Sequence, residues 1–183
     1  MRRGLPPSFF VILRFLVTFL GFFCIALGAY GQDPAPSAEL RVDDYSAPTP
    51  SSIPGARLID TAELRHLMQA PPARRPLLFD VRGERHDSLP GAIWLPGAGR
   101  GTSFNDALQV RLAGVLRQVT RGNVERTLVF FCAGPRCWLS YNASLRAVRL
   151  GYRDVRWYRE GTEVWGEGGG ALLAPQIRWK PAQ

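Results

Sequence analysis

Short apolar runs alternate with segments of helical hydrophobic spacing from residue 57 onward. The runs are rich in Leu, Ile, Val or aromatic residues, which is typical of buried strands, and they occupy residues 57–59, 77–81, 92–95, 128–131 and 154–158. Helical spacing runs from Asp60 or Thr61 to Pro71, and it recurs over residues 104–119 and 138–150. This alternation predicts an α/β fold with a mostly parallel sheet of about five strands and helices on both faces.

Three polar or reactive side chains lie at the ends of the predicted strands. Asp80 and Arg82 end the run at residues 77–81, and Cys132 follows the run at 128–131. Ligands of parallel α/β sheets bind beyond the carboxyl ends of the strands. The pattern therefore indicates a candidate site at Asp80, Arg82 and Cys132, with the cysteine in a loop between the central strand and the next helix.

The residues before the alternating region are typical of an export signal. Arg2 and Arg3 form a basic start, residues 15–27 form an apolar or small-residue core, and Ala29 and Gly31 offer small side chains at the two positions that a signal peptidase reads. The core is shorter than the ~20 apolar residues of a membrane span, which favours cleavage before Gln32 over retention as an anchor. We therefore expect a periplasmic or secreted protein with no membrane span after cleavage.

The expected organisation has four parts. A signal peptide covers residues 1–31, a Pro- and Ser-rich N-terminal arm covers 32–55, one α/β domain covers 56–166, and a C-terminal tail covers 167–183. The formal net charge of the whole chain is +8, part of which belongs to the leader. The remaining arginines are scattered among acids and form no basic stripe, so we expect no nucleic-acid partner.

Two cysteines, Cys132 and Cys137, lie outside the predicted leader, and both belong to one loop. A cysteine just before a helix faces unpaired backbone amides and the positive end of the helix dipole, which favour the thiolate. Such a thiolate can attack a sulfur donor and hold the product as a persulfide, and Arg136 would add positive charge for an anionic substrate. The alternative is a buried structural thiol or half of an inert disulfide.

The spacing around the loop excludes several other cysteine sites. A thiol phosphatase needs an arginine six positions after its cysteine, and a haem attachment site needs a histidine after its second cysteine; Trp138 stands at both places. A thioredoxin-type pair has two intervening residues, whereas four separate Cys132 from Cys137. His66 and His86 are interpreted as solvated or helix-face residues, so the ligand set for a metal is incomplete and we expect neither a metal nor a cofactor.

Over most of residues 57–165 the chain resembles the rhodanese family. The resemblance rests on a series of motifs in a specific order: Leu78-Phe79-Asp80-Val81-Arg82, Leu89-Pro90-Gly91-Ala92-Ile93, Val129-Phe130-Phe131-Cys132, Gly151-Tyr152 and Glu160-Gly161 through Trp165. It implies a single rhodanese-like domain in which Cys132 is the persulfide cysteine.

A narrower resemblance extends over nearly the whole chain after residue 31. Four segments are similar to the exported rhodanese-like proteins called PQQ-dependent catabolism-associated CXXCW motif proteins: residues 44–50, residues 53–56, Cys137-Trp138-Leu139-Ser140-Tyr141-Asn142-Ala143 and residues 151–158. This resemblance implies a periplasmic role beside a quinoprotein alcohol dehydrogenase or its c-type cytochrome.

Two departures from sulfurtransferase loops favour thiol–disulfide chemistry. Cys137 stands at the sixth loop position, where a basic or polar residue is usual, and Arg136 stands one place early. Asp87-Ser88 replaces the usual Gly-His before the Pro-Gly-Ala turn.

We therefore expect an exported accessory protein of PQQ-dependent alcohol oxidation that acts through sulfane-sulfur or thiol–disulfide chemistry. The open alternatives are an active thiosulfate-type sulfurtransferase with a Cys132 persulfide and a rhodanese-fold binding module without activity. The expected ligand is a small sulfur compound or a thiol. The predicted catalytic residues are Cys132, Cys137 and Arg136, and the predicted substrate-binding residues are Ala133, Gly134, Pro135, Trp138, Asp80 and Arg82.

Overall fold

The computed structural model describes residues 33–84 and 86–177, and these ranges contain one parallel sheet of six strands. The strands are β1 (Arg57–Ile59), β2 (Leu77–Asp80), β3 (Ile93–Trp94), β4 (Leu128–Phe131), β5 (Val155–Tyr158) and β6 (Gln176–Ile177). Their order across the sheet is β1-β5-β4-β2-β3-β6, and every neighbouring pair is parallel. The predicted fold class is confirmed, and the predicted signal peptide lies outside the described residues.

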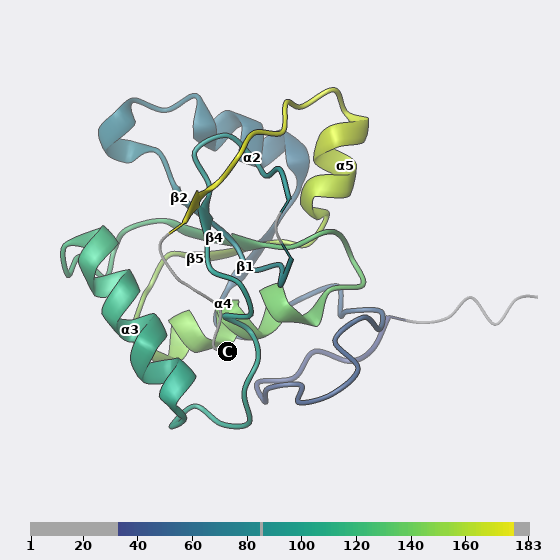
Figure 1. Ribbon diagram of the computed structural model, residues 1–183, viewed down its shortest axis with the longest axis vertical. Helices are drawn as coiled ribbons and strands as arrows, with labels where there is room; N and C mark the ends of the chain where they lie inside the picture. The colour runs from purple at the N-terminus through teal and green to yellow at the C-terminus, as the bar shows by residue number, and fades with distance from the viewer. Residues whose placement is uncertain (1–32, 85, 178–183) are drawn as a thin grey trace, which may run out of the picture. The chain divides into compact units, whose positions relative to one another are not determined.

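Helices cover both faces of the sheet, as the sequence predicts (Figure 1). They are α2 (Thr61–Met68), α3 (Ala107–Thr120), α4 (Trp138–Arg149) and α5 (Gly161–Glu167), with a 3₁₀ turn at Pro72–Arg74. Asp60 caps α2 by accepting a hydrogen bond from the Glu63 N–H at 2.7 Å. Asp106 caps α3 in the same way, accepting from the Gln109 N–H at 2.8 Å. The capping aspartates explain where these helices begin. None of the described helices has the length and apolarity that a membrane span needs.

The two faces of the central strands build two separate cores. Phe79 of β2 and Phe130 of β4 stack with their ring centroids 4.9 Å apart, and they face α3 and α4. Leu78, Val129 and Phe131 belong to the opposite core, which α2 and α5 close. Side chains on both faces of β4 are fully buried, so its unbroken apolar run is the pattern that a strand covered on both sides requires.

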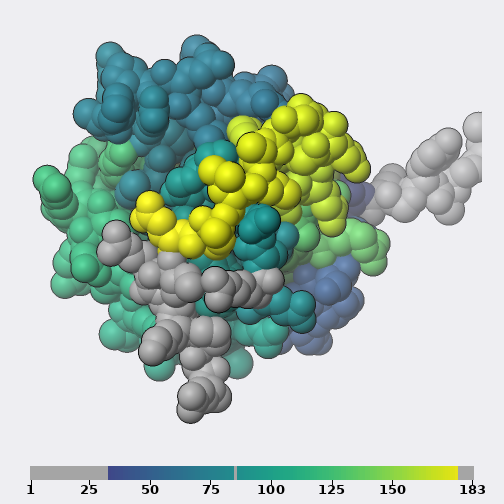
Figure 2. All heavy atoms as spheres, turned by 45° about the horizontal axis from the view of Figure 1, so that its top comes forward, coloured from purple at the N-terminus to yellow at the C-terminus, as the bar shows by residue number. Residues whose placement is uncertain are grey.

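Two elements were not predicted from the sequence, namely α5 and β6. Strand β6 lies in the region predicted as a tail, and it is held by pairing with β3 and by the Gln176 N–H, which donates to the Ala92 carbonyl at 2.9 Å. An antiparallel bridge between Ser88 and Leu173 precedes it. Figure 2 shows this C-terminal stretch, in yellow, lying across the surface of the domain.

The N-terminal arm docks on α4 through backbone contacts. The Tyr141 hydroxyl accepts from the Ser37 N–H at 2.9 Å and donates to the Ser37 carbonyl at 2.7 Å. The Asn142 amide does the same with the N–H and carbonyl of Arg41, at 3.0 and 2.7 Å, and also donates to the Gly99 carbonyl at 2.8 Å. Part of the predicted linker is therefore a bound segment of the domain.

Replacement of Asn142 by alanine will loosen this arm. The buried amide makes all three bonds, so Asn142→Ala leaves backbone groups of Arg41 and Gly99 without their partner, at a cost of about 1–3 kcal/mol. We expect a lower urea midpoint and faster trypsin cleavage at Arg41. Asn105→Ala, which alters an exposed asparagine, is the matched control. Equal cleavage rates in the two variants would contradict the docking role.

Candidate functional site

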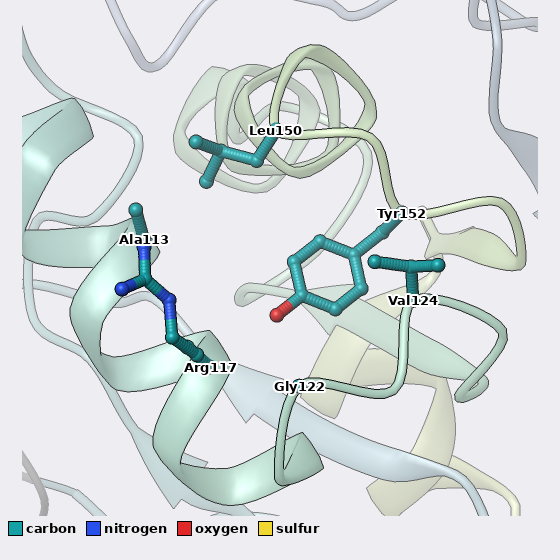
Figure 3. A pocket seen from close by; sticks show the side chains of 6 residues that line it. All are labelled: Ala113, Arg117, Gly122, Val124, Leu150 and Tyr152. Carbon is teal, nitrogen blue, oxygen red and sulfur yellow. The ribbon is translucent and has the colours of Figure 1, made fainter.

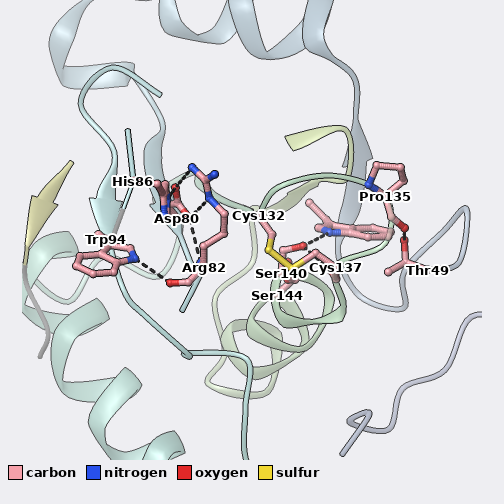
Figure 4. Close-up of a disulfide and its surroundings, with 11 residues drawn as sticks. Thr49, Asp80, Arg82, His86, Trp94, Cys132, Pro135, Cys137, Ser140 and Ser144 are labelled. Carbon is pink, nitrogen blue, oxygen red and sulfur yellow. Dashed lines mark hydrogen bonds and ion pairs between the residues drawn. A yellow bond between two sulfur atoms is a disulfide. The ribbon is translucent and has the colours of Figure 1, made fainter. Parts of the chain in front are cut away.

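The cysteine loop begins where β4 ends, beside the end of β2. The register pairs Asp80 with Phe131, and the Val81 N–H donates to the Phe131 carbonyl at 3.1 Å. Cys132 is the next residue and is only 3% exposed. The two strand ends therefore bring Asp80, Arg82 and Cys132 to one edge of the sheet, as predicted from the sequence (Figure 4).

Cys132 and Cys137 form a disulfide, with their Cα atoms 6.1 Å apart. Cys137 caps the N-terminus of α4 and is partly exposed, whereas Cys132 is buried. The bond closes the loop formed by Ala133, Gly134, Pro135 and Arg136. A crosslink across so few residues restricts the unfolded chain by only about 2 kcal/mol, so its main effect is on the local shape of the loop.

Helix α5 holds the loop from one side. The Thr162 N–H donates to the Cys132 carbonyl at 3.1 Å, and the Glu163 N–H donates to the Ala133 carbonyl at 2.9 Å. This approach requires glycine at position 161, because its φ is +65° and an added Cβ would lie 2.4 Å from the carbonyl oxygens of Cys132 and Ala133. The close approach of α5 to the loop thus explains the glycine of the Glu160-Gly161 motif.

The N-terminal arm holds the loop from the other side. Both the N–H and the hydroxyl of Thr49 donate to the Pro135 carbonyl, at 3.1 and 2.6 Å. The Trp138 N–H donates to the Tyr45 carbonyl at 2.9 Å. Arg159, at the end of β5, donates to the hydroxyl and carbonyl of Thr49. Sequence reasoning missed Thr49 and Arg159, although the arm's resemblance to the narrower family was a signal.

Trp138 packs beneath the arm. The side chain is 4% exposed, and its indole N–H donates to the Pro48 carbonyl at 3.0 Å. Its ring packs edge-to-face against Tyr141, which packs in turn against Trp157. Trp138 thus contacts the arm and an apolar cluster that includes Tyr141 and Trp157, and its role in substrate binding stays a prediction.

Asp80 is the centre of a buried polar network. Its carboxylate accepts hydrogen bonds from the Arg82 side chain, from Ser88 Oγ at 2.5 Å and from His86 Nε2 at 2.7 Å. Burial acts to raise the pKa of Asp80, but the hydrogen bonds from His86, Arg82 and Ser88 outweigh it and hold the pKa below its ordinary value. Asp80 is therefore a structural anion that orients Arg82.

The interpretation of His86 as a solvated residue is wrong. Its ring lies between the Asp80 carboxylate and the Glu84 carbonyl, and its side chain is only 17% exposed. The reason is that the segment after β2 folds back onto the strand end, which no hydrophobic pattern reveals. Arg82 also donates to the Asp87 carbonyl at 2.8 Å and thereby closes the same turn.

Arg136 is exposed, and the described residues offer it no hydrogen bond or ion pair. The positive charge that was predicted to bind an anionic substrate therefore lies on the rim of the loop. Ala133, Gly134 and Pro135 form the part of the loop between Cys132 and Arg136. Within residues 33–84 and 86–177, no group of three or more His, Cys, Asp or Glu side chains is arranged to hold a metal.

A surface hollow lies away from the cysteine loop. Arg117, Gly122, Val124, Leu150 and Tyr152 are among the residues that line it (Figure 3). It borders the C-terminal end of α4, whose twelve residues span ~18 Å from the disulfide end. This hollow is therefore separate from the sulfur site.

A parallel α/β sheet with a cysteine loop between its central strand and the following helix defines a rhodanese-fold domain. The rhodanese-like domain family matches residues 60–167. The chain belongs to the rhodanese-like family. No curated protein is similar to it in sequence.

Solved structures with the same fold include much longer proteins. The thiosulfate sulfurtransferase from Pseudomonas aeruginosa is 22% identical, with a TM-score of 0.50, and the match covers 70% of this chain and 22% of that protein. Wild-type EanB is 17% identical, with a TM-score of 0.50, and the match covers 70% of this chain and 33% of EanB. The chain thus spans about a fifth to a third of these proteins, and at such identities the likeness establishes the fold.

The Asp80 network predicts a specific dependence of stability on pH. Because the folded pKa of Asp80 lies below the unfolded value of about 3.9, its contribution is complete above that value and is lost as the pH falls through the folded pKa. Asp80→Asn should cost about 3 kcal/mol at pH 7, since Arg82 and His86 lose their buried anion, and should flatten the acid limb of the stability curve.

Urea unfolding at several pH values between neutral and strongly acid conditions measures both effects. Asp87→Asn, which changes an exposed neighbouring carboxylate, is the control and should follow the wild-type curve. An Asp80→Asn protein as stable as the control at pH 7 would show that the network is dispensable.

Proposed function

We propose that the protein is an exported, thiol–disulfide-active rhodanese-fold protein that serves PQQ-dependent alcohol oxidation in the periplasm. The single observation that supports the chemistry is the Cys132–Cys137 disulfide at the mouth of the sheet. The biological setting rests on the similarity of residues 44–56 and 137–143 to the PQQ-associated rhodanese-like proteins. Its partner is a quinoprotein alcohol dehydrogenase or its c-type cytochrome.

The unequal exposure of the two cysteines defines the order of the exchange. Cys137 is partly exposed and Cys132 is buried, so an incoming thiolate attacks Cys137 Sγ. A mixed disulfide forms with Cys137, the bond between the two cysteines breaks, and Cys132 leaves as a thiolate. A second thiolate then attacks the mixed disulfide at the sulfur of the first thiol, which releases that thiol as a disulfide and leaves Cys137 as a thiolate.

The position of the loop favours both thiolate products. Cys137 caps α4, and Cys132 lies five residues earlier in the closed loop, so both belong to the positive end of that helix. Thiolates near helix N-termini have lowered pKa values and are better leaving groups in exchange. The α4 N-terminus therefore makes the disulfide easier to reduce.

Sulfur transfer is the second candidate function, and the position of Cys132 at the end of β4 favours it. After reduction, the Cys132 thiolate attacks the outer sulfur of thiosulfate, and sulfite leaves. The Cys137 thiolate then attacks Cys132 Sγ, re-forms the disulfide and releases hydrosulfide. Thiocyanate formation from thiosulfate and cyanide that depends on Cys132 is the assay for this function.

Single-cysteine variants test the assignment of the attacked sulfur. In protein that begins at Gln32, Cys132→Ser leaves only the partly exposed Cys137, and Cys137→Ser leaves only the buried Cys132. Cys137 in Cys132→Ser should react with a small aromatic disulfide about tenfold faster than Cys132 in Cys137→Ser, because access controls the rate.

The control is the oxidised wild-type protein, in which Cys132 and Cys137 become free thiols only after dithiothreitol is added. A disulfide that resists dithiothreitol in the native protein would contradict thiol–disulfide activity and leave the crosslink as a structural lock.

Deletion of the gene tests the biological setting. The deletion strain should grow poorly on alcohols that a PQQ-dependent dehydrogenase oxidises and normally on succinate. The wild-type gene should restore growth, and the variant with both Cys132→Ser and Cys137→Ser should not. Unchanged growth on the alcohol would contradict the accessory role but not the thiol chemistry.

A further inference from the structure

The charge arrangement around the cysteine loop differs from that of an anion-binding loop. We infer that Glu163 makes the disulfide selective against anionic sulfur compounds, so that neutral or cationic thiols are its preferred partners. This inference rests on the thiol–disulfide function proposed above. It assigns to Glu163 a role in specificity rather than in bond breaking.

The Glu163 carboxylate lies directly against the loop. An added Cβ on Gly134 would meet Glu163 Oε2 at 2.1 Å and Cδ at 2.8 Å, so the carboxylate already occupies the space beside Gly134. The main chain of Glu163 is tied to the loop, because the Glu163 N–H donates to the Ala133 carbonyl at 2.9 Å. Glu163 is exposed, and no side chain among the described residues neutralises it through a hydrogen bond or ion pair.

The Tyr45 carbonyl occupies part of the N-terminal end of α4, which would otherwise be open to an anion. Free N–H groups at a helix N-terminus form a ready anion site. Here the first of them, the Trp138 N–H, donates to the Tyr45 carbonyl at 2.9 Å. The arm thus fills part of the cradle with an uncharged oxygen, while Glu163 places a negative charge on the other side of the loop.

The neighbouring cations compensate for Glu163 only in part. Arg82 is bound to Asp80, and Arg159 is bound to Thr49 and Asp33. Arg136 extends from the loop into solvent, and no ion pair joins it to Glu163 in the described part of the chain. The Glu163 carboxylate therefore lies against Gly134, whereas no hydrogen bond or ion pair among the described residues holds Arg136 beside it.

The size of the effect is estimated from the interaction of two unit charges at close range in water. Two unit charges about 6 Å apart in water change a rate or equilibrium by roughly threefold. A thiolate with an additional negative group should therefore be slowed about threefold relative to a neutral one, and a thiolate with a positive group should be accelerated to a similar extent. Added salt should reduce both effects.

Three small thiols of different charge test the inference on the oxidised full chain. The probes are 2-mercaptoethanesulfonate, 2-mercaptoethanol and cysteamine, with each rate of disulfide reduction corrected for the thiolate fraction and measured by alkylation and mass spectrometry. In Glu163→Gln the ratio of the anionic to the cationic rate should rise by about threefold to tenfold over wild type, and the rate with 2-mercaptoethanol, whose thiolate carries a single negative charge, should rise less than the rate with the sulfonate.

Glu167→Gln is the matched control, because Glu167 is an exposed acid of the same helix that does not lie against Gly134. It should keep the wild-type ratio. The inference is overturned if Glu163→Gln keeps the wild-type ratio or if both variants change it equally. Failure of the neutral thiol to reduce the wild-type disulfide contradicts the proposed function itself, so the two failures are distinguishable.

Discussion

The carbonyl groups of the cysteine loop impose the constraint on which the site depends. A tight loop beyond the ends of the strands can pair little of its own backbone, and buried carbonyls need donors. Helix α5 supplies donors to Cys132 and Ala133, the Cys137 N–H supplies one to Gly134, and Thr49 of the arm supplies two to Pro135. Segments far apart in sequence therefore converge on a few residues, and the disulfide completes a conformation that they already hold.

Sequence reasoning located the sulfur site because its signals are local. The apolar run of β4, the position of Cys132 at its end and the helical spacing behind it are properties of neighbouring residues. The same reasoning extended the helix at residues 104–119 too far toward the N-terminus, because Asp106 caps α3 and the helix begins at Ala107. Boundaries depend on single capping bonds, whereas the existence of an element depends on its whole pattern.

The missed parts all depend on tertiary contact. Strand β6 has two residues and forms only by pairing with β3. Helix α5 is a seven-residue segment that contains three glycine or threonine positions of low helix propensity, and it is stabilised by its contacts with the loop. His86 and Thr49 reach the site through chain reversals, and their partners are charged or backbone groups that leave no periodic signal. A disulfide likewise needs geometry that spacing alone does not provide.

The way in which Tyr141 and Asn142 bind the arm has a consequence for how this segment can evolve. Both side chains bind main-chain atoms, so they recognise the path of the arm and not the chemical character of the bound residues. These backbone bonds exclude only proline at positions 37 and 41, because each position must supply an N–H. The Arg41 side chain adds a constraint at its own position, since it stacks over Trp138 and pairs with Asp44. Related chains are therefore freer to diverge at position 37 than at position 41 while keeping the arm in register over the cysteine loop.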